Sequence, residues 1–182
     1  TFDKDFINPK KPDYVYKYYV LDCVNWSEHL DLLVDEQGQA MGILFGSIEN
    51  TTFGKRLKFK ARQIALRAEF WFHILNGDFG DRRRAVAVYK DMRNINADGE
   101  SAARLFDSEV NLFILSPAVR GQGYGKKLMD RYIEFCKQNR LKKAFLWTTT
   151  TCTWQFYERY GFQLHQRFTH QGLSPKELKA PN

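Results

Sequence analysis

Cysteine is scarce in this chain of 182 residues, and the three present, Cys23, Cys136 and Cys152, are far apart. An odd number of scattered cysteines argues against a disulfide framework and against a CxxC zinc site. The four histidines show no HExxH or comparable spacing, so the sequence predicts no metal site. We expect reduced thiols and, with them, a cytoplasmic location.

Long apolar runs are also absent. No stretch approaches the roughly 18 consecutive apolar residues of a membrane-spanning helix, and residues 1–5 lack the basic-then-apolar pattern of a signal segment. We therefore expect no membrane partner. Neither an internal repeat nor a long Gly/Ser/Pro linker divides the chain, and its length suits one domain over residues 1–182.

The charges do not balance, because Lys and Arg exceed Asp and Glu to give a formal net charge of +7. Such a charge favours an anionic partner, whether nucleic acid, a membrane surface or a phosphorylated cofactor, but a solvated basic surface explains it equally well. Basic residues concentrate in 55–62 and 82–84, where they are more typical of a solvated helix face than of a nucleic-acid groove. The sequence therefore does not favour a nucleic-acid partner.

Apolar residues form 43% of the chain, including 15 Phe and 9 Tyr, so material for a core is ample. Their spacing predicts helices at 13–25, 55–76, 82–95, 124–139 and 153–160, and strands at 30–35, 40–48, 110–115, 144–149 and 162–168. The first two strands flank a short turn and form an antiparallel hairpin. Asp81 is the expected N-cap of the helix that begins at residue 82.

The strand 110–115, the helix 124–139 and the strand 144–149 form a βαβ unit, which requires its two strands to be parallel. Combined with the hairpin, this unit predicts an α/β (α+β) fold. Its sheet is mixed and largely antiparallel, with helices flanking it and one parallel strand pair.

A glycine-rich loop joins the strand 110–115 to the helix 124–139. Glycines allow the backbone to turn sharply and to approach a ligand closely. The first N–H groups of a helix lack internal partners and carry partial positive charge, and Arg120 and Lys126 add to it. These features predict a phosphate or pyrophosphate site, although a turn that merely needs glycine would have the same composition. Neither the Walker pattern nor GxGxxG fits.

Three segments resemble the GNAT superfamily of acetyl-coenzyme A-dependent N-acetyltransferases. The run Arg120-Gly121-Gln122-Gly123-Tyr124-Gly125 matches the Arg-x-x-Gly-x-Gly pattern with which that family holds the coenzyme A pyrophosphate. Residues 112–117, Leu-Phe-Ile-Leu-Ser-Pro, resemble its fourth strand. Residues 155–162, Gln-Phe-Tyr-Glu-Arg-Tyr-Gly-Phe, resemble its last helix. The resemblance covers 30–48 loosely and 108–168 well.

The resemblance implies one GNAT-like domain with a divergent or truncated N-terminal part and a helical insertion at about 55–97. It also implies acetyl-coenzyme A as cosubstrate, and the histidine and cysteine spacing predicts no metal beside it. In the family, the fourth and fifth strands splay apart, and pantetheine pairs with the backbone of the fourth. By resemblance, that contact falls on Phe113, Ile114 and Leu115, with the Leu115 N–H as the donor to the acetyl carbonyl. The remaining coenzyme contacts fall on Arg120, Gly121, Gln122, Gly123, Tyr124, Gly125 and Lys126.

Two side chains are candidates for acid–base catalysis. Tyr157 matches the family's general acid, which protonates the departing thiolate, although the aromatic residues around it would also suit a core position. Glu109 precedes Leu115 by six residues, an offset at which some members carry a general base, but a surface glutamate is an equal interpretation. Strand alternation is expected to place Glu109, Asn111, Phe113 and Leu115 on one face, where a dry cleft would raise the carboxyl pKa.

The function that follows is transfer of an acetyl group from acetyl-coenzyme A to a primary amine. Transfer of a longer acyl group, or transfer to a hydroxyl, stays open, as does a non-catalytic coenzyme A- or nucleic-acid-binding domain. The sequence does not indicate the acceptor, which could be a small amine, an antibiotic, a polyamine or a protein. It does not indicate the oligomeric state either.

Overall fold

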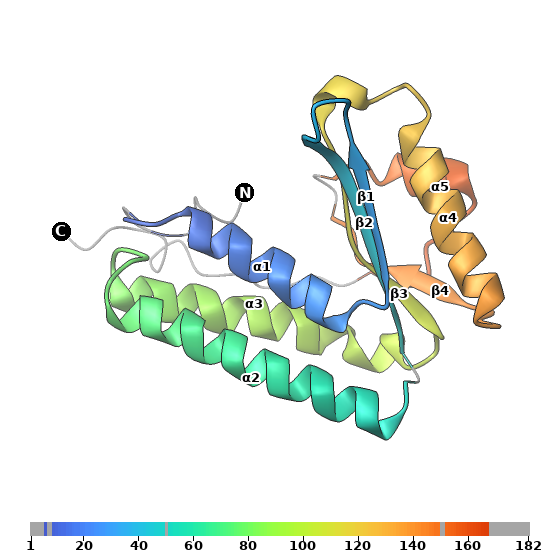
Figure 1. Cartoon of the computed structure of the whole chain (residues 1–182). Coiled ribbons are helices and arrows are strands. Elements are labelled where there is room, and N and C mark those ends of the chain that lie inside the picture. Colours follow the sequence, from blue (N-terminus) through green and yellow to red (C-terminus); the bar gives the residue numbers. More distant parts are fainter. Residues whose placement is uncertain (1–5, 7–8, 50, 150–151, 168–182) are drawn as a thin grey trace. The chain divides into compact units, whose positions relative to one another are not determined.

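The computed structural model describes residues 6, 9–49, 51–149 and 152–167, without the side chains of 94–102. The elements follow in the order α1 (Asp13–Trp26), β1 (His29–Val34), β2 (Ala40–Ile48), α2 (Phe53–Leu75), α3 (Arg82–Ala103), β3 (Ser108–Leu115), α4 (Tyr124–Gln138), β4 (Ala144–Leu146) and α5 (Gln155–Tyr160). They form two compact units. One is helical, with α1, α2 and most of α3, and the other holds the sheet with α4 and α5 (Figure 1).

Most predicted elements are confirmed, and three predictions of extent are wrong. The helix α3 continues to Ala103, because isolated weak helix formers such as Gly99 cost only about 1 kcal/mol. The strand β4 ends at Leu146 instead of 149. Residues 162–167, expected to form the last strand, have no regular secondary structure, because none of their backbone groups joins the sheet. Phe168 lies outside the described residues.

In the helical unit, α1, α2 and α3 run side by side around an aromatic core (Figure 1). The Phe70 ring lies 4.8 Å from the Phe79 ring and 5.4 Å from the Tyr89 ring, measured between centroids. The Asp81 carboxylate accepts a hydrogen bond from the Arg84 N–H at 2.7 Å, which confirms the predicted cap. None of the helices in the described part of the chain is long and apolar enough to span a membrane.

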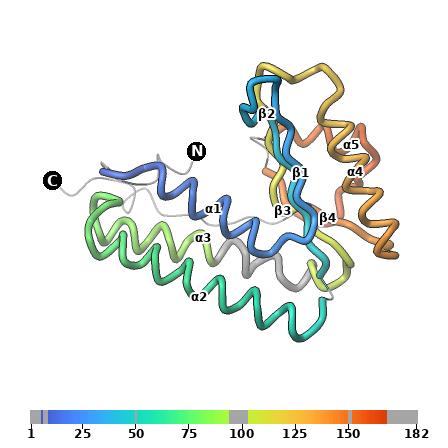
Figure 2. Tube along the Cα trace, in the orientation of Figure 1, coloured from blue at the N-terminus to red at the C-terminus, as the bar shows by residue number. Residues whose placement is uncertain are grey.

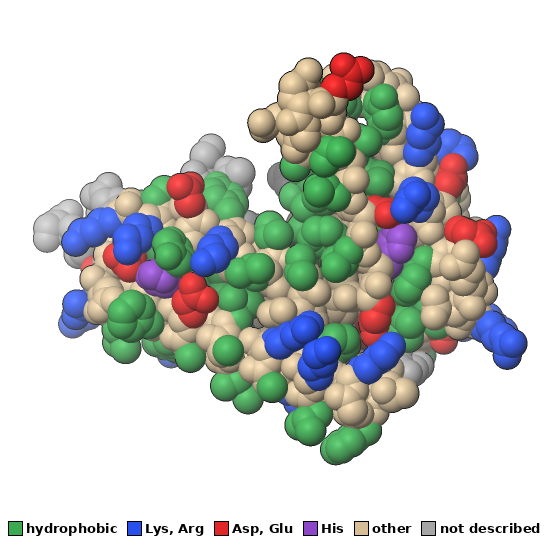
Figure 3. Space-filling model, in the orientation of Figure 1, with side chains coloured by type: hydrophobic (Ala, Val, Ile, Leu, Met, Phe, Trp, Pro, Cys, Tyr) green, Lys and Arg blue, Asp and Glu red, His purple; other side chains and the backbone are tan. Residues whose placement is uncertain are grey.

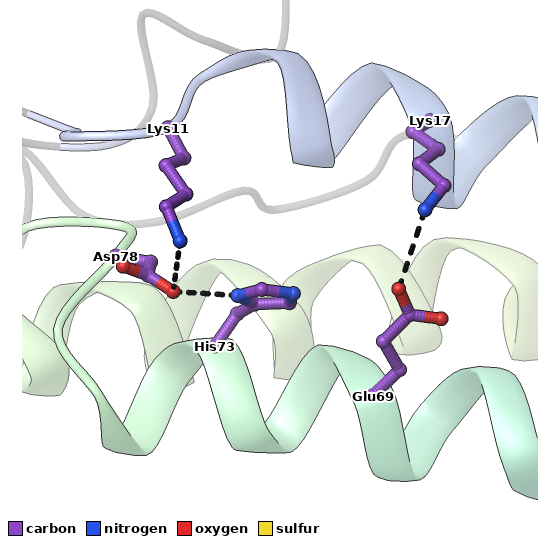
Figure 4. A network of polar contacts seen from close by, with 5 residues as sticks. All are labelled: Lys11, Lys17, Glu69, His73 and Asp78. Carbon is purple, nitrogen blue, oxygen red and sulfur yellow. Dashed lines mark hydrogen bonds and ion pairs between the residues drawn. The ribbon is translucent and has the colours of Figure 1, made fainter.

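A polar network joins the loop after α2 to the segment before α1 (Figure 4). The Asp78 carboxylate lies 2.6 Å from His73 Nδ1 and 3.4 Å from the Lys11 ammonium. The hydrogen bond with His73 is the main cause that lowers the pKa of Asp78. A second ion pair, between Lys17 and Glu69 at 3.4 Å, lies further along the same two helices. The network therefore fixes one end of the helical unit.

The sheet has the strand order β1-β2-β3-β4, with the first two pairs antiparallel and the last parallel. Figure 2 traces the chain through these four strands. This confirms the predicted mixed, largely antiparallel sheet and its parallel pair. One face of the sheet is covered by α4. The buried residues between them are Leu44, Val110, Leu128, Met129, Tyr132 and Cys136.

Two sets of contacts hold α4 in place. Gly46 lies beneath the ring of Tyr132, and any Cβ at this position would overlap that ring. The Tyr132 hydroxyl lies 2.6 Å from the Ser108 hydroxyl, so the buried phenol is satisfied. Arg131 donates two hydrogen bonds of 2.8 Å to the buried Asp31 carboxylate on β1. The helix is thus held to both β1 and β3.

A β-bulge in β3 reverses the faces of that strand. Phe45 pairs with Leu112 and Gly46 pairs with Val110, so Asn111 is an extra residue opposite β2. Val110, which precedes the bulge, packs toward α4. Phe113 and Leu115, which follow the bulge, also pack toward α4. Glu109 alternates with Val110, so its side chain points to the opposite face. The prediction that Glu109, Phe113 and Leu115 share one face is therefore wrong.

Candidate functional site

The edge of β3 that faces β4 is open over its second half. The two strands pair only at Ser108–Ala144, Glu109–Phe145 and Val110–Leu146, whereas β3 continues to Leu115. Beyond Leu146 the described residues 147–149 form no strand. β4 therefore ends while β3 continues, and this leaves an edge of β3 to which an extended ligand could add as a strand.

The direction of the backbone N–H groups along this edge follows from one hydrogen bond. The Ser116 N–H donates to the Met41 carbonyl at 2.8 Å, on the β2 side. Successive N–H groups of a strand point to opposite edges, so those of Phe113 and Leu115 point to the open edge. The Leu115 carbonyl also faces that edge and accepts a hydrogen bond from the Arg120 guanidinium at 3.3 Å. The backbone N–H of Ile114 points toward β2, so it is not available to a ligand at the open edge.

The glycine loop leads from the end of β3 to the first turn of α4. Gly121 and Gly123 have φ angles of +78° and +81°, which L side chains rarely adopt. A Cβ added to either would meet no atom within 4 Å, so the surface of the loop is open at both. Gly123 is the N-cap of α4, and the first intrahelical bond joins the Lys127 N–H to its carbonyl at 3.1 Å. The preceding N–H groups, of Tyr124, Gly125 and Lys126, have no carbonyl partner within the helix, and such groups can bind an anion.

The side chains of the loop differ in what they contact. Gln122 donates to the Ala118 carbonyl at 2.9 Å, which braces the loop. The Lys126 ammonium lies 2.7 Å from the Asp130 carboxylate, so its positive charge is paired within the helix. Gly125 is buried, and a Cβ there would meet Leu115 Cδ1 at 3.0 Å. Gly125 therefore also serves to bring α4 close to β3.

Tyr157 and Tyr160 on α5 lie in different environments. The Tyr157 ring is 6.3 Å from the Phe113 ring, beside the open edge, and burial raises the pKa of Tyr157 to about 12. Its hydroxyl makes no hydrogen bond with any described residue. The Tyr160 hydroxyl instead donates to the Asp130 carboxylate on α4 at 2.7 Å. Tyr157 is thus the phenol available to a ligand.

Glu109 lies on β3 opposite Ser47, on the face of the sheet turned away from α4. Burial is the main cause that raises the pKa of Glu109 to about 8, and the nearby Glu49 carboxylate adds to it. A carboxyl with such a pKa is mostly protonated at neutral pH, and its ionised fraction can accept a proton from an amine. The raised pKa agrees with the expectation from sequence, although the face does not.

A group of polar side chains around Glu109 was not predicted. The Ser47 hydroxyl lies 3.1 Å from a Glu49 carboxylate oxygen and 3.3 Å from the Asn111 side-chain oxygen, and it can donate its single proton to either. The Asn111 amide donates to Ser27 at 2.8 Å. The bulge at Asn111 is what places this amide beside Ser47. No local sequence pattern marks that bulge, because it depends on pairing with β2.

Comparison with known proteins places the chain in a family. The profile of the Acetyltransferase (GNAT) family matches residues 9–162, which include the helical unit as well as the glycine loop and α5. The chain belongs to the GNAT acetyltransferase family, whose members transfer an acyl group from acyl-coenzyme A and use acetyl-coenzyme A as cosubstrate. Curated proteins gave no match to the chain, and solved structures gave none.

Proposed function

We propose that the protein transfers an acetyl group from acetyl-coenzyme A to a primary amine, by direct attack in a ternary complex. The observation that carries this proposal is the open edge of β3. At one end of that edge lies a helix terminus suited to a pyrophosphate, and beside it lies the unbonded Tyr157 hydroxyl. A phosphate and an extended thiol arm on the same ligand fit these two features together.

The cosubstrate would lie along the strand with its pyrophosphate at the first turn of α4. Arg120, Gly121, Gln122 and Gly123 form the approach to that turn, and the N–H groups of Tyr124, Gly125 and Lys126 point toward the anion. The pantetheine amides would pair with the open edge at Phe113 and Leu115. This pairing uses backbone groups alone and leaves the Phe113 side chain in contact with α5.

The position of the acetyl carbonyl follows from the length of the strand. Leu115 lies about 20 Å from Glu109 at about 3.3 Å per residue, whereas Phe113 lies roughly 13 Å away at most. The ring of Phe113 is also the one beside Tyr157. The Phe113 N–H is therefore a better donor to the acetyl oxygen than the Leu115 N–H expected from the sequence.

The acid and the base would then act from opposite faces of the sheet. The Glu109 carboxylate accepts a proton from the ammonium group of the acceptor, directly or through water, and the neutral nitrogen attacks the thioester carbon. The carbonyl oxygen takes up negative charge next to the Phe113 N–H. The carbon–sulfur bond breaks, and the thiolate takes the proton of the Tyr157 hydroxyl. The nitrogen still carries a surplus proton after its attack, and this proton passes to the Tyr157 phenolate, directly or through water, while Glu109 releases the ammonium proton to solvent.

Thiol release from acetyl-coenzyme A, measured over a panel of acceptors with mass spectrometry of each product, tests the proposal. The panel pairs each primary amine with the alcohol of the same carbon skeleton. Acetylated amine is the expected product. Acetylated alcohol with unmodified amine would show that the acceptor is a hydroxyl. Failure of calorimetry to detect either acetyl-coenzyme A or coenzyme A at millimolar concentration would refute the coenzyme site itself.

A further inference from the structure

The helix α2 has a second apolar face that its own unit does not bury. One face, with Phe59, Leu66, Phe70 and Ile74, packs in the core of the helical unit. The opposite face is a stripe that we call the α2 seam, and it consists of Leu57, Ala61, Ile64, Ala68, Trp71 and Leu75, all of them exposed. Hydrophobic side chains gather over α2 at the lower edge of the space-filling view, with Lys and Arg beside them (Figure 3).

The spacing of the α2 seam is that of a coiled coil. Its members are separated by four, three, four, three and four residues, which is the 3.5-residue period of a helix–helix interface. Small and large residues alternate along it, because Ala61 and Ala68 occupy one heptad position and Leu57, Ile64 and Trp71 the other. A lipid surface requires neither the period nor the alternation, so both features favour a helical occupant.

We propose that the occupant is the α2 seam of a second copy of this chain, in antiparallel orientation. In an antiparallel pair, the two heptad positions face each other, so each of the two alanines meets a larger residue. A two-fold axis beside Leu66 gives the layers Ala61 with Trp71, Ile64 with Ala68 and Leu57 with Leu75, each joining one chain to its partner. A parallel pair would instead place alanine against alanine and Trp71 against Trp71, with voids in some layers and excess volume in others.

Charge favours the same orientation. The first part of α2, residues 53–62, carries Lys55, Arg56, Lys58, Lys60 and Arg62 with no acidic residue, whereas residues 63–75 hold one arginine and one glutamate. Antiparallel pairing lays the basic part of each helix beside the nearly neutral part of the other. It also brings Lys58 next to the exposed ring of Phe72, where the lysine stem and charge can both contact the aromatic face.

The exposed area is sufficient for a dimer. Leu57, Ile64, Phe72 and Leu75 are each 60–67% exposed, and Trp71 is 36% exposed. With roughly 100 Å² from each of these side chains and less from the alanines, one seam together with the adjoining Phe72 presents on the order of 600 Å². Two seams together bury about 1,200 Å², which is the lower limit of stable, specific interfaces. This area also reaches the upper limit for the largest apolar patch of a typical monomer.

Sedimentation velocity of the full chain tests the proposal. The wild type is expected to show the mass of two chains at micromolar concentration. Ile64→Lys should raise the dissociation constant roughly a hundredfold or more, because each of the two central layers then buries a charge. Leu32→Lys is the matched control, since Leu32 is an equally exposed apolar residue on β1. A two-chain mass lost with Leu32→Lys and retained with Ile64→Lys would overturn the proposal.

A layer exchange tests the orientation. Ile64→Ala leaves alanine opposite alanine, and Ala68→Ile leaves isoleucine opposite isoleucine, so each single variant should weaken the dimer. The double variant restores one small and one large residue to each central layer and should recover wild-type association. Absence of recovery would refute the antiparallel register. A wild-type mass of one chain at about 100 μM would refute the dimer. If that single chain also co-sedimented with anionic vesicles, the seam would be assigned to a lipid surface.

Discussion

Replacing Glu109 by glutamine should change the pH dependence of stability as well as of activity. Burial raises the pKa of Glu109 from its ordinary 4.5 to about 8 in the folded protein. The folded state therefore binds more protons than the unfolded state between these two values, and the contribution of Glu109 to stability is fully present below pH 4.5. That contribution is lost as the pH rises toward 8. Glutamine resembles the protonated carboxyl and carries no such dependence.

The magnitude follows from the width of that interval. At about 1.4 kcal/mol per pH unit, a span of roughly 3.5 units gives an upper bound near 5 kcal/mol. Because the side chain is only partly buried, solvent screening reduces this figure, and we expect 2–4 kcal/mol, an order-of-magnitude estimate. Glu109→Gln should match the wild type near pH 5 and exceed its stability by that amount at pH 8.5.

Urea unfolding of both proteins at several pH values measures this difference. Glu36→Gln is the control, because Glu36 is an exposed carboxylate in the turn between β1 and β2. A stability difference between Glu109→Gln and the wild type that stays constant from pH 5 to 8.5 would refute the raised pKa. In the activity assay, kcat/KM of the wild type should fall about tenfold per pH unit below pH 8, and the variant should lack this limb.

Three further predictions concern the coenzyme site. Tyr157→Phe should lower the rate of acetyl transfer in single-turnover assays about a hundredfold, with little change in coenzyme A affinity. Tyr160→Phe should lower the melting temperature and leave that rate nearly intact. The reverse result would assign the general acid to Tyr160. Gly123→Ala should weaken coenzyme A binding in calorimetry and cost about 1–2 kcal/mol of stability from its positive φ. Gly38→Ala strains a similar φ of +78° and should leave affinity unchanged, so equal affinity in both variants would contradict the assignment of the loop. Arg120→Ala should bind coenzyme A more weakly than wild type and lose part of its salt dependence, and an unchanged dissociation constant would exclude a contact with the pyrophosphate.

Secondary structure followed from the sequence because its signals are local. Helical and alternating apolar patterns are set by side chains a few residues apart, so the sequence alone predicts the helices α1, α2 and α4 and the hairpin β1–β2. The Asp81 cap was predictable for the same reason. The glycine loop was also recognisable, since positive φ angles at Gly121 and Gly123 require that residue type.

Other features depended on partners distant in the sequence. The length of β4 is set by how far it pairs with β3, and residues 162–167 pair with no strand of the sheet. Gly46 lies in no local turn pattern. Glycine is required there because the Tyr132 ring on α4 leaves no space for a Cβ atom. The environment of Tyr160 also depends on a distant partner, because its hydroxyl donates to the Asp130 carboxylate on α4, whereas the Tyr157 hydroxyl bonds to no described residue.

The sequence by itself determined the family, the glycine loop and the identity of the acid–base candidates, because each rests on residue types at short, fixed spacings. Tertiary structure alone decided the face on which Glu109 lies. Strand alternation predicts the face of a side chain only where the strand pairs regularly. The extra residue at Asn111 reverses the faces of the residues that follow it relative to Glu109. The raised pKa of Glu109 likewise comes from burial and from Glu49, which the chain brings near it only when β2 and β3 pair.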